Sequence, residues 1–284
     1  MSKIKVIIIL GQTATGKSNL AVKIAKKING EIISADSRQV YKGLDIGTGK
    51  ITKKEMQGVP HYLINVVNPK NKFTVVEYQK KAIYAIAEII KKGKIPIICG
   101  GTGFYIDAIT KGTIFPEVMP NKELRKSLDK KTEIELFNIL KKLDKVRAKN
   151  IKNKNELKNK VRLIRAIEIA KALGKVPKIR EEKPIYKFVK IGLYLPPDKL
   201  KKKVEQRVKK MFKTGLIKEI KKLKKSGISE KRLKEFGFEY YKPTPEKVVK
   251  ETLKYAKRQM TWFKRDPEIK WFDASKRNDI LNEL

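Results

Sequence analysis

The chain has 284 residues, with 69 Lys and Arg against 30 Asp and Glu, which gives a formal net charge of +39 at pH 7. A hydrophobic content of 40% excludes a disordered chain, and the length suits one large domain or a domain with a smaller companion. Cys99 is the only cysteine and His61 the only histidine, which excludes an internal disulfide and a multi-cysteine metal site. No apolar stretch approaches the roughly 20 residues that span a bilayer, so we expect a cytoplasmic protein with no membrane contact.

The first 116 residues predict alternating strands and helices. Short apolar runs typical of buried parallel strands alternate with segments of helical periodicity, in the order strand Val6–Leu10, helix Asn19–Ala25, strand Glu31–Ala35, helix Thr74–Lys92 and strand Ile95–Cys99. The helix Thr74–Lys92 is expected to bury one stripe of Val76, Ala82, Ile83, Ile86, Ala87 and Ile90. This order predicts an α/β domain built on a parallel sheet.

The composition changes after Pro116. Between Asn121 and Gly174 the pattern predicts helices rich in Lys and Arg without a strand, so residues 117–185 are expected to form a helical insertion. Residues 186–284 are expected to return to the core with a strand at Phe188–Leu195, a helix from Pro197 and a last helix from Thr244 to Phe263.

A phosphate-binding motif lies between the first strand and the first helix. The segment GQTATGKS fits the pattern GxxxxGK[ST] at Gly11, Gln12, Thr13, Ala14, Thr15, Gly16, Lys17 and Ser18. Its glycines let backbone amides surround a phosphate, Lys17 is placed to reach the terminal phosphate, and Ser18 can give its hydroxyl to Mg²⁺. The sequence therefore predicts a diphosphate or triphosphate site on a P-loop NTPase-like sheet flanked by helices.

Asp36 ends the second predicted strand and has two candidate roles. It can hold Mg²⁺, as the second acidic residue of a P-loop NTPase does, or it can act as a general base. The polar residues Ser37, Arg38 and Gln39 beside it favour the second role. The strand Ile95–Cys99 ends in glycine rather than aspartate, which argues against an ordinary NTP-driven motor.

Several further segments resemble the tRNA dimethylallyltransferase family, also called isopentenyl-tRNA transferases. They follow the family's order from Gly11 to Phe263, and comprise the P-loop, Asp36–Thr48, Gly58–Leu63, Gly100–Tyr105, Arg162–Glu168 and Tyr255–Phe263. The resemblance implies transfer of a dimethylallyl group from dimethylallyl diphosphate to the N6 amine of the adenine 3′ of the anticodon in tRNA. The product would be N6-isopentenyladenosine, and the P-loop would hold the donor's diphosphate with Mg²⁺ as cofactor.

The same resemblance implies roles for individual residues. Asp36, Thr13 and Arg207 would be catalytic, with Asp36 as general base on a flipped adenine and Arg207 on the diphosphate. Positions that would contact the anticodon stem-loop are Asp36, Ser37, Arg38, Gln39, Thr102, Arg125, Val161, Arg162, Leu163, Ile164, Arg165, Phe236, Gly237, Phe238, Lys257 and Arg258. Gln259 and Thr261 continue the last of these segments, and Val161 departs from the Arg or Gln that relatives often carry. Tyr255 and Trp262 are expected in the core, and a monomer is expected.

Three other functions remain open at this point. A P-loop kinase would explain the phosphate motif, and a prenyltransferase acting on free AMP or ADP would share the chemistry. A non-catalytic RNA-binding protein would explain the charge. The lysine excess also fits an AT-rich genome or heat adaptation through surface ions.

Overall fold

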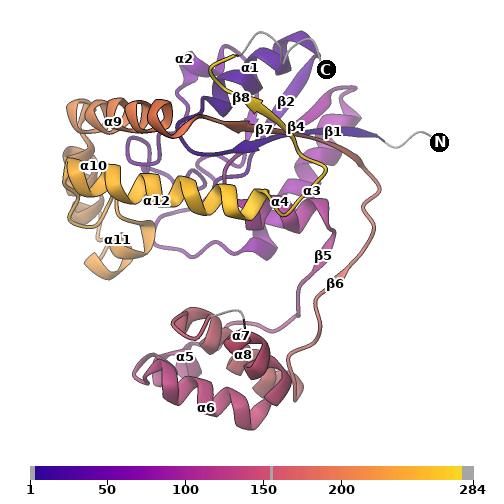
Figure 1. Cartoon of the computed structure of the whole chain (residues 1–284), viewed down its shortest axis with the longest axis vertical. Helices are drawn as coiled ribbons and strands as arrows, with labels where there is room; N and C mark the ends of the chain where they lie inside the picture. Colours follow the sequence, from indigo (N-terminus) through magenta and orange to yellow (C-terminus); the bar gives the residue numbers. More distant parts are fainter. Residues whose placement is uncertain (1–3, 154–155, 277–284) are drawn as a thin grey trace. The chain divides into compact units, whose positions relative to one another are not determined.

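A computed structural model describes residues 4–153 and 156–276. Contacts within the chain divide it into two compact units. The first combines the segments up to Gly112 and from Lys183 onward, and the second spans Thr113–Glu182. Figure 1 shows the chain with its elements labelled, and each unit is described by itself below.

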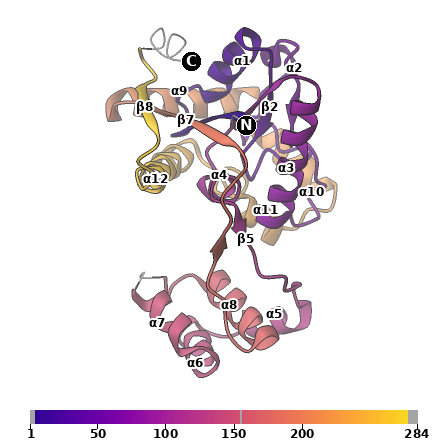
Figure 2. The same cartoon turned by 90° about the vertical axis from the view of Figure 1, so that its right-hand side faces the viewer.

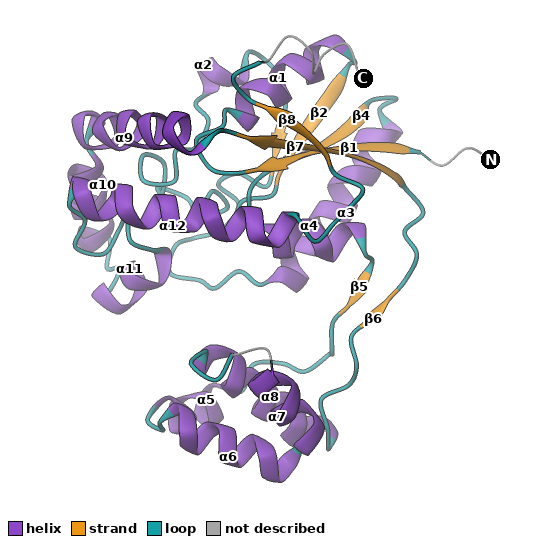
Figure 3. Ribbon diagram, viewed as in Figure 1, coloured by secondary structure: helices purple, strands orange, loops and turns teal. Residues whose placement is uncertain are grey.

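The first unit is built on a parallel sheet of six strands in the order β3-β2-β4-β1-β7-β8. Figure 3 shows strands in orange and helices in purple. The strands are β1 (Lys5–Gly11), β2 (Gly30–Ser34), β3 (His61–Tyr62), β4 (Ile95–Cys99), β7 (Lys187–Tyr194) and β8 (Lys270–Asp273). The central strand β1 pairs with β4 on one side and β7 on the other. The predicted α/β domain with a parallel sheet is confirmed, whereas β3 and β8 had no clear sequence signal.

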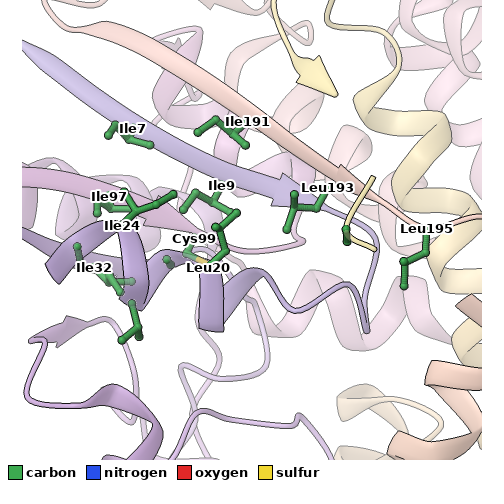
Figure 4. Close-up of a cluster of buried hydrophobic side chains, with 14 of the residues drawn as sticks. Ile7, Ile9, Leu20, Ile24, Ile32, Ile97, Cys99, Ile191, Leu193 and Leu195 are labelled. Carbon is green, nitrogen blue, oxygen red and sulfur yellow. The ribbon is translucent and has the colours of Figure 1, made fainter. Parts of the chain in front are cut away.

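Alternate residues of β1 feed two different cores, as the two-residue period of a strand requires. Ile7 and Ile9 pack with α1 (Lys17–Lys27) and α9 (Pro197–Thr214) on one face, as the close-up in Figure 4 shows for the α1 side. Val6, Ile8 and Leu10 pack on the other face with α3 (Val75–Lys91) and α4 (Gly103–Thr110). Burial on both faces explains why β1 is an uninterrupted apolar run.

The buried face of α3 differs from the predicted stripe. Val76 and Ile83 are each 44% exposed, while the helix buries Tyr78, Ala82, Ala85, Ile86 and Ile89. The ring of Tyr78 stacks on that of Tyr105 in α4, with centroids 3.9 Å apart. Apolar residues lie on more than one side of this helix, so packing against α4 and the sheet selects the face, which periodicity alone did not.

The remaining helices of the first unit are α2 (Lys53–Met56), α10 (Leu216–Lys225), α11 (Glu230–Phe236) and α12 (Pro245–Phe263). The predicted start of α12 is confirmed, since the Thr244 hydroxyl accepts a hydrogen bond from the Lys247 amide at its N-terminus. Helices α10 and α11 share a third core with Val40, Tyr41 and Leu44. No helix in the described part of the chain is both long and apolar enough to cross a membrane.

The second unit is a small helical bundle (Figure 2). Its helices are α5 (Lys122–Asp129), α6 (Glu133–Leu143), α7 (Lys145–Asn153) and α8 (Lys160–Leu173). Leucine and isoleucine side chains from all of them form one core. A short antiparallel pair, β5 (Thr113–Ile114) with β6 (Arg180–Glu181), joins the two ends of the unit and was not predicted.

Gly11, the last residue of β1, lies in close contact with the backbone of β7, and this contact can be tested. A Cβ there would lie 2.1 Å from the Leu193 carbonyl oxygen, and φ is +127°. Gly11→Ala should therefore lower the free energy of unfolding by about 2–4 kcal/mol, measured by urea denaturation. Gly58→Ala is the control, because φ there is +81° but no atom lies within 4 Å. It should cost only about 1 kcal/mol, and equal losses would contradict the proposed clash.

Candidate active site

A cavity of about 310 Å³ lies where the carboxyl ends of β1, β2 and β4 meet. Parallel strands place the loops that follow them at one edge of a sheet, which is the usual ligand-binding edge of an open α/β fold. The cavity is lined by residues of the P-loop, of the turn after β2 and of the loop after β4, together with Arg207 of α9 and Tyr255 and Gln259 of α12. Segments that are far apart in sequence thus face one space.

The P-loop has the curvature of an anion-binding loop. Gly11, Ala14 and Gly16 all have positive φ, and Gly16 leads directly into α1 with no side chain capping the helix. The uncapped first-turn amides and the helix dipole favour an anion at this end. The Thr15 hydroxyl donates to the Gln12 carbonyl at 2.8 Å, and the Leu195 amide donates to the Gln12 side chain at 3.1 Å. These bonds hold the loop against the end of β7.

Lys17 and Arg207 bring positive charge to the cavity. The Lys17 ammonium donates to the Gln12 carbonyl, and desolvation, with a further contribution from Arg207, lowers its pKa to about 8. Arg207 projects from α9 beside the buried Val204 and Val208 and donates to the Thr48 carbonyl at 2.9 Å. The structure therefore brings the predicted diphosphate cations together, although they are 190 positions apart in the chain.

Asp36 lines the same cavity. Its Oδ1 accepts from the Arg38 amide at 2.8 Å and from the Gln39 amide at 3.2 Å, which fixes the turn after β2. Both recorded hydrogen bonds use the same oxygen. The aspartate can therefore hold this turn with one oxygen and present the other to a ligand.

Thr102 joins the turn after β2 to the loop after β4. Its hydroxyl accepts from the Ser37 amide at 3.0 Å, and its own amide donates to the Ala35 carbonyl at 3.1 Å. Cys99, at the end of β4, is buried, and burial raises the pKa of its thiol to about 12. Cys99 is consequently a packing residue of the cavity wall and not a nucleophile at neutral pH.

Glu219 of α10 is a residue that the sequence did not point to. Its carboxylate accepts from three successive amides, of Asp45 at 3.0 Å, Ile46 at 2.7 Å and Gly47 at 3.1 Å, and from the Tyr240 hydroxyl at 2.8 Å. These bonds fix the loop whose Thr48 carbonyl holds Arg207. The two partners are separated by more than 170 residues, so no local pattern marks the interaction.

Helix α12 contributes differently from the prediction. Tyr255, expected in the core, lines the cavity and lies under the Arg258 guanidinium, 5.7 Å from its ring centroid. Lys257 and Arg258 are exposed. Gln259, expected on that surface, is buried. Trp262 is half-buried and packs on the second core, which confirms its predicted place.

The predicted segment Phe236–Phe238, at the C-terminal end of α11, is partly buried. Phe236 is 1% exposed and packs with Tyr41 and Tyr240, so its side chain supports the fold and does not face RNA. Gly237 ends the helix with φ +123° and Phe238 packs against the first core. Burial raises the pKa of Glu239 to about 7, against the opposing effects of Arg207 and Arg38.

In the helical unit, the predicted RNA-contacting residues divide into three groups. Leu163 and Ile164 are buried in its core, so the prediction that their side chains contact tRNA is corrected. Val161 is exposed, and Arg162 is exposed and paired with Glu156. The last group, Arg125 and Arg165, is bound to a buried carboxylate.

That carboxylate belongs to Glu168, whose side chain is 2% exposed. Arg125 donates to it through Nε at 2.9 Å and Nη2 at 2.7 Å, Arg165 through Nη1, and the Asn121 amide at 2.7 Å. Arg165 also donates to the Val118 carbonyl at 2.9 Å. Both arginines thus hold α5 and the preceding segment to α8.

A family profile and individual relatives identify the same protein family. The sequence profile described as IPP transferase matches residues 39–266. The tRNA dimethylallyltransferases of Carboxydothermus hydrogenoformans and Bacillus subtilis are 41% and 37% identical to this chain, covering 96% of it and 93% and 92% of their own lengths. The chain belongs to the tRNA dimethylallyltransferase family. This confirms the predicted resemblance and the prediction of a prenyl-transferring enzyme.

Solved structures of similar fold come from the same kind of enzyme. The full-length tRNA isopentenylpyrophosphate transferase of Bacillus halodurans gives a TM-score of 0.72 at 34% identity, covering 99% of this chain and 95% of that one. A eukaryotic dimethylallyltransferase, described in crystallographic snapshots of its action on tRNA, gives 0.79 at 26% identity, covering 99% of this chain and 77% of its own. The P-loop and Asp36 precede the profile match, but these structural matches extend over them. The P-loop NTPase-like fold is therefore confirmed.

The lowered pKa of Lys17 predicts how diphosphate binding depends on pH. The ammonium form binds the anion, and in the free protein it is lost as pH rises through about 8. The dissociation constant of dimethylallyl diphosphate, measured by calorimetry without tRNA, should rise roughly tenfold between about pH 7 and pH 9. Lys17→Met should bind weakly at both values, and an equally steep pH dependence in this variant would exclude Lys17 as the titrating group.

Glu168 is expected to stabilise the helical unit at neutral pH and to lose this effect in acid. Burial alone would raise its pKa, but hydrogen bonds from Arg125, Arg165 and the Asn121 amide hold it below the ordinary 4.5. A carboxyl with a depressed pKa stabilises the fold above its unfolded pKa and loses this effect as pH falls through its folded pKa.

Glu168→Gln should therefore lower the free energy of unfolding by about 1–3 kcal/mol at neutral pH, with a smaller difference under acid conditions. Thermal unfolding of the two proteins across the pH range measures this. Glu133→Gln, at an exposed glutamate of α6, is the control and should change stability by about 0.5 kcal/mol or less. A Glu168→Gln difference that does not shrink on acidification would contradict the ion-pair explanation.

Proposed function

We propose that this chain transfers the dimethylallyl group of dimethylallyl diphosphate to the N6 amine of the adenine 3′ of the anticodon in tRNA, giving N6-isopentenyladenosine. One observation carries the proposal. A single cavity is lined by the P-loop with Lys17, by Arg207, by Asp36 and by Gly100 and Gly101 of the loop that leads to Thr102. An anion site and a carboxylate in one cavity are what a displacement of diphosphate by an amine requires.

The leaving group determines the cationic side. The bond from N6 to the allylic carbon forms while the bond from that carbon to a diphosphate oxygen breaks, and the diphosphate departs with the electron pair. Lys17, Arg207 and the P-loop amides would neutralise the charge that develops on it. Thr13 would contribute through its hydroxyl, because its amide already donates to Gln259 at 2.8 Å.

Asp36 would take the proton. An exocyclic adenine amine is a weak nucleophile, so a placed carboxylate that accepts a proton from N6 assists the attack. Because Oδ1 of Asp36 holds the turn, the other carboxylate oxygen, Oδ2, would face the adenine. Ser37, Arg38 and Gln39, all half-buried on the same turn, would contact the adenine or its neighbours.

The cavity suits Mg²⁺ that the substrate itself helps to hold. The described residues include no cluster of three or more His, Cys, Asp or Glu that could bind a metal by themselves. Mg²⁺ is typically bound by one or two protein oxygens together with substrate phosphates and water. The Ser18 hydroxyl and the donor's diphosphate fit that pattern, and the ion would add positive charge at the leaving group.

The acceptor would be the anticodon stem-loop, with the target base turned out of its stack into the cavity. The exposed Lys257 and Arg258 on α12 and the high positive charge support RNA as the partner. We also propose that the protein acts in the cytoplasm as a monomer. The relatives named above are tRNA-modifying enzymes, which favours tRNA over free AMP or ADP.

One assay separates the candidates. Radiolabelled dimethylallyl diphosphate is offered with unmodified tRNA or with AMP in parallel, and γ-labelled ATP is offered separately. Label from the donor in tRNA supports the proposal, whereas label only in AMP supports the free-nucleotide enzyme. Phosphoryl transfer from ATP supports the kinase, and tight RNA binding without any transfer supports the non-catalytic protein.

Asp36→Asn tests the base. Asparagine keeps an oxygen that can accept the Arg38 and Gln39 amides but has no basicity, so the turn should persist. We expect kcat to fall by about 10²–10⁴-fold while the dissociation constant of tRNA changes by less than roughly threefold. Single-turnover transfer and filter binding measure the two quantities. Parallel losses of both would make Asp36 a binding residue.

A further inference from the structure

The side chain of Gln259 bonds to two loops that line the cavity. Its Oε1 accepts from the Thr13 amide in the P-loop at 2.8 Å, and its Nε2 donates to the Gly101 carbonyl in the loop after β4 at 2.9 Å. The residue is 5% exposed and lies on the wall of the cavity. The carboxamide is therefore a cross-link between the diphosphate loop and the loop that carries Thr102.

The surroundings are shaped for this group. A Cβ on residue 101 would lie 2.1 Å from Gln259 Nε2, so glycine at this position makes room for the contact. The pairing needs an acceptor and a donor on one planar group, in the orientation that an amide or a protonated carboxyl provides. A methionine of similar length fills the space without either bond.

The cross-link lies between the groups that must approach each other. Thr13 belongs to the loop that would hold the donor, and the Gly101 loop continues to Thr102, which is bonded to Ser37 beside Asp36. We propose that Gln259 is a positioning residue that sets the distance between the diphosphate of the donor and the carboxylate that receives the N6 proton. This inference rests on the proposed function.

The expected effect is on the chemical step. Reacting atoms must come within roughly 3–3.5 Å, and a misplacement of about 1 Å can cost on the order of 100-fold in rate. Both polar groups of Gln259 are occupied by the protein, so its loss should leave binding of each separate substrate nearly unchanged. Because Gln259 accepts the hydrogen bond of the Thr13 amide, the phosphates would be bound by the later amides of the loop.

Gln259→Glu gives a reversible test. The ionised carboxylate can still accept from the Thr13 amide but cannot donate to the Gly101 carbonyl. Protonation of the carboxyl restores a donor, so both bonds can form again. We expect kcat, at saturating donor and tRNA, to fall about 30–100-fold at about pH 8 and to recover relative to the unchanged protein as pH is lowered toward 6.

Gln259→Met should lose about the same factor without any recovery at lower pH, with KM for both substrates within roughly threefold of the unchanged protein. Gly101→Ala reaches the same bond from the other side, by displacing the carboxamide, and should reproduce this loss. Gln79→Met is the matched control. The Gln79 amide of α3 donates to the Ala108 carbonyl at 2.6 Å away from the cavity, so the change should affect stability and leave kcat intact.

Four outcomes overturn the positioning role. These are a Gln259→Glu profile parallel to that of the unchanged protein, a Gln259→Met loss confined to KM of the donor, a loss confined to tRNA affinity, and a loss shared by Gln79→Met. The second and third would make Gln259 a ligand of substrate. Thermal unfolding of each variant identifies losses caused by poor folding, and Gly101→Ala then decides. Absence of label in tRNA with the unchanged protein would overturn the proposed function itself, and the positioning role with it.

Discussion

The parallel pairing of β2, β4 and β1 is the constraint on which the site depends. Cys99 pairs with Ile9 of β1 and with Ser34 of β2, so β2 and β4 end in register and β1 ends two residues farther on, at Gly11. The backbone stays close beyond the pairing, because the Ala35 amide donates to the Cys99 carbonyl at 2.8 Å and a Cβ on Gly100 would lie 2.2 Å from the Ala35 oxygen. The phosphate loop and the aspartate turn therefore emerge side by side before any side chain is considered.

Helices from the end of the chain complete what the strand ends begin. Helix α9 supplies Arg207, α10 supplies Glu219, and α12 supplies Gln259, and each side chain bonds to a loop of the first hundred residues. The geometry links them: Glu219 holds the backbone before Thr48, and the Thr48 carbonyl holds Arg207. A carboxylate that accepts several amides is a strong and directional contact. The cation is thus placed by a relay of backbone hydrogen bonds, and no residue that the structure describes forms an ion pair with it.

Sequence reasoning succeeded where the determinant is local. The P-loop, the strands β1, β2 and β4 and the start of α12 are encoded by short patterns, and all were predicted. It failed where distant partners decide. The buried face of α3 depends on the Tyr78 and Tyr105 stack, and neither Glu219 nor Gln259 stands in a pattern that names its partner. Tyr255 was assigned to the core because aromatic residues in amphipathic helices usually pack there. The cavity that it lines exists only in the folded sheet.

The arginines show why net charge is a poor guide to an RNA surface. In a chain of net charge +39, the sequence alone counts Arg125 and Arg165 as two more cations for a polyanion. In the structure both guanidinium groups instead donate hydrogen bonds to Glu168, whose side chain is 2% exposed. Removing either partner would leave a buried charge unpaired and would destabilise the fold. Each is about a third exposed, so some charge still reaches solvent, but the guanidinium planes are fixed by the protein. The role that the structure shows for them is consequently to hold α5 and the segment before it to α8. Lys257 and Arg258, exposed on α12, are free of such a buried carboxylate among the described contacts, and it is there that charge can act directly.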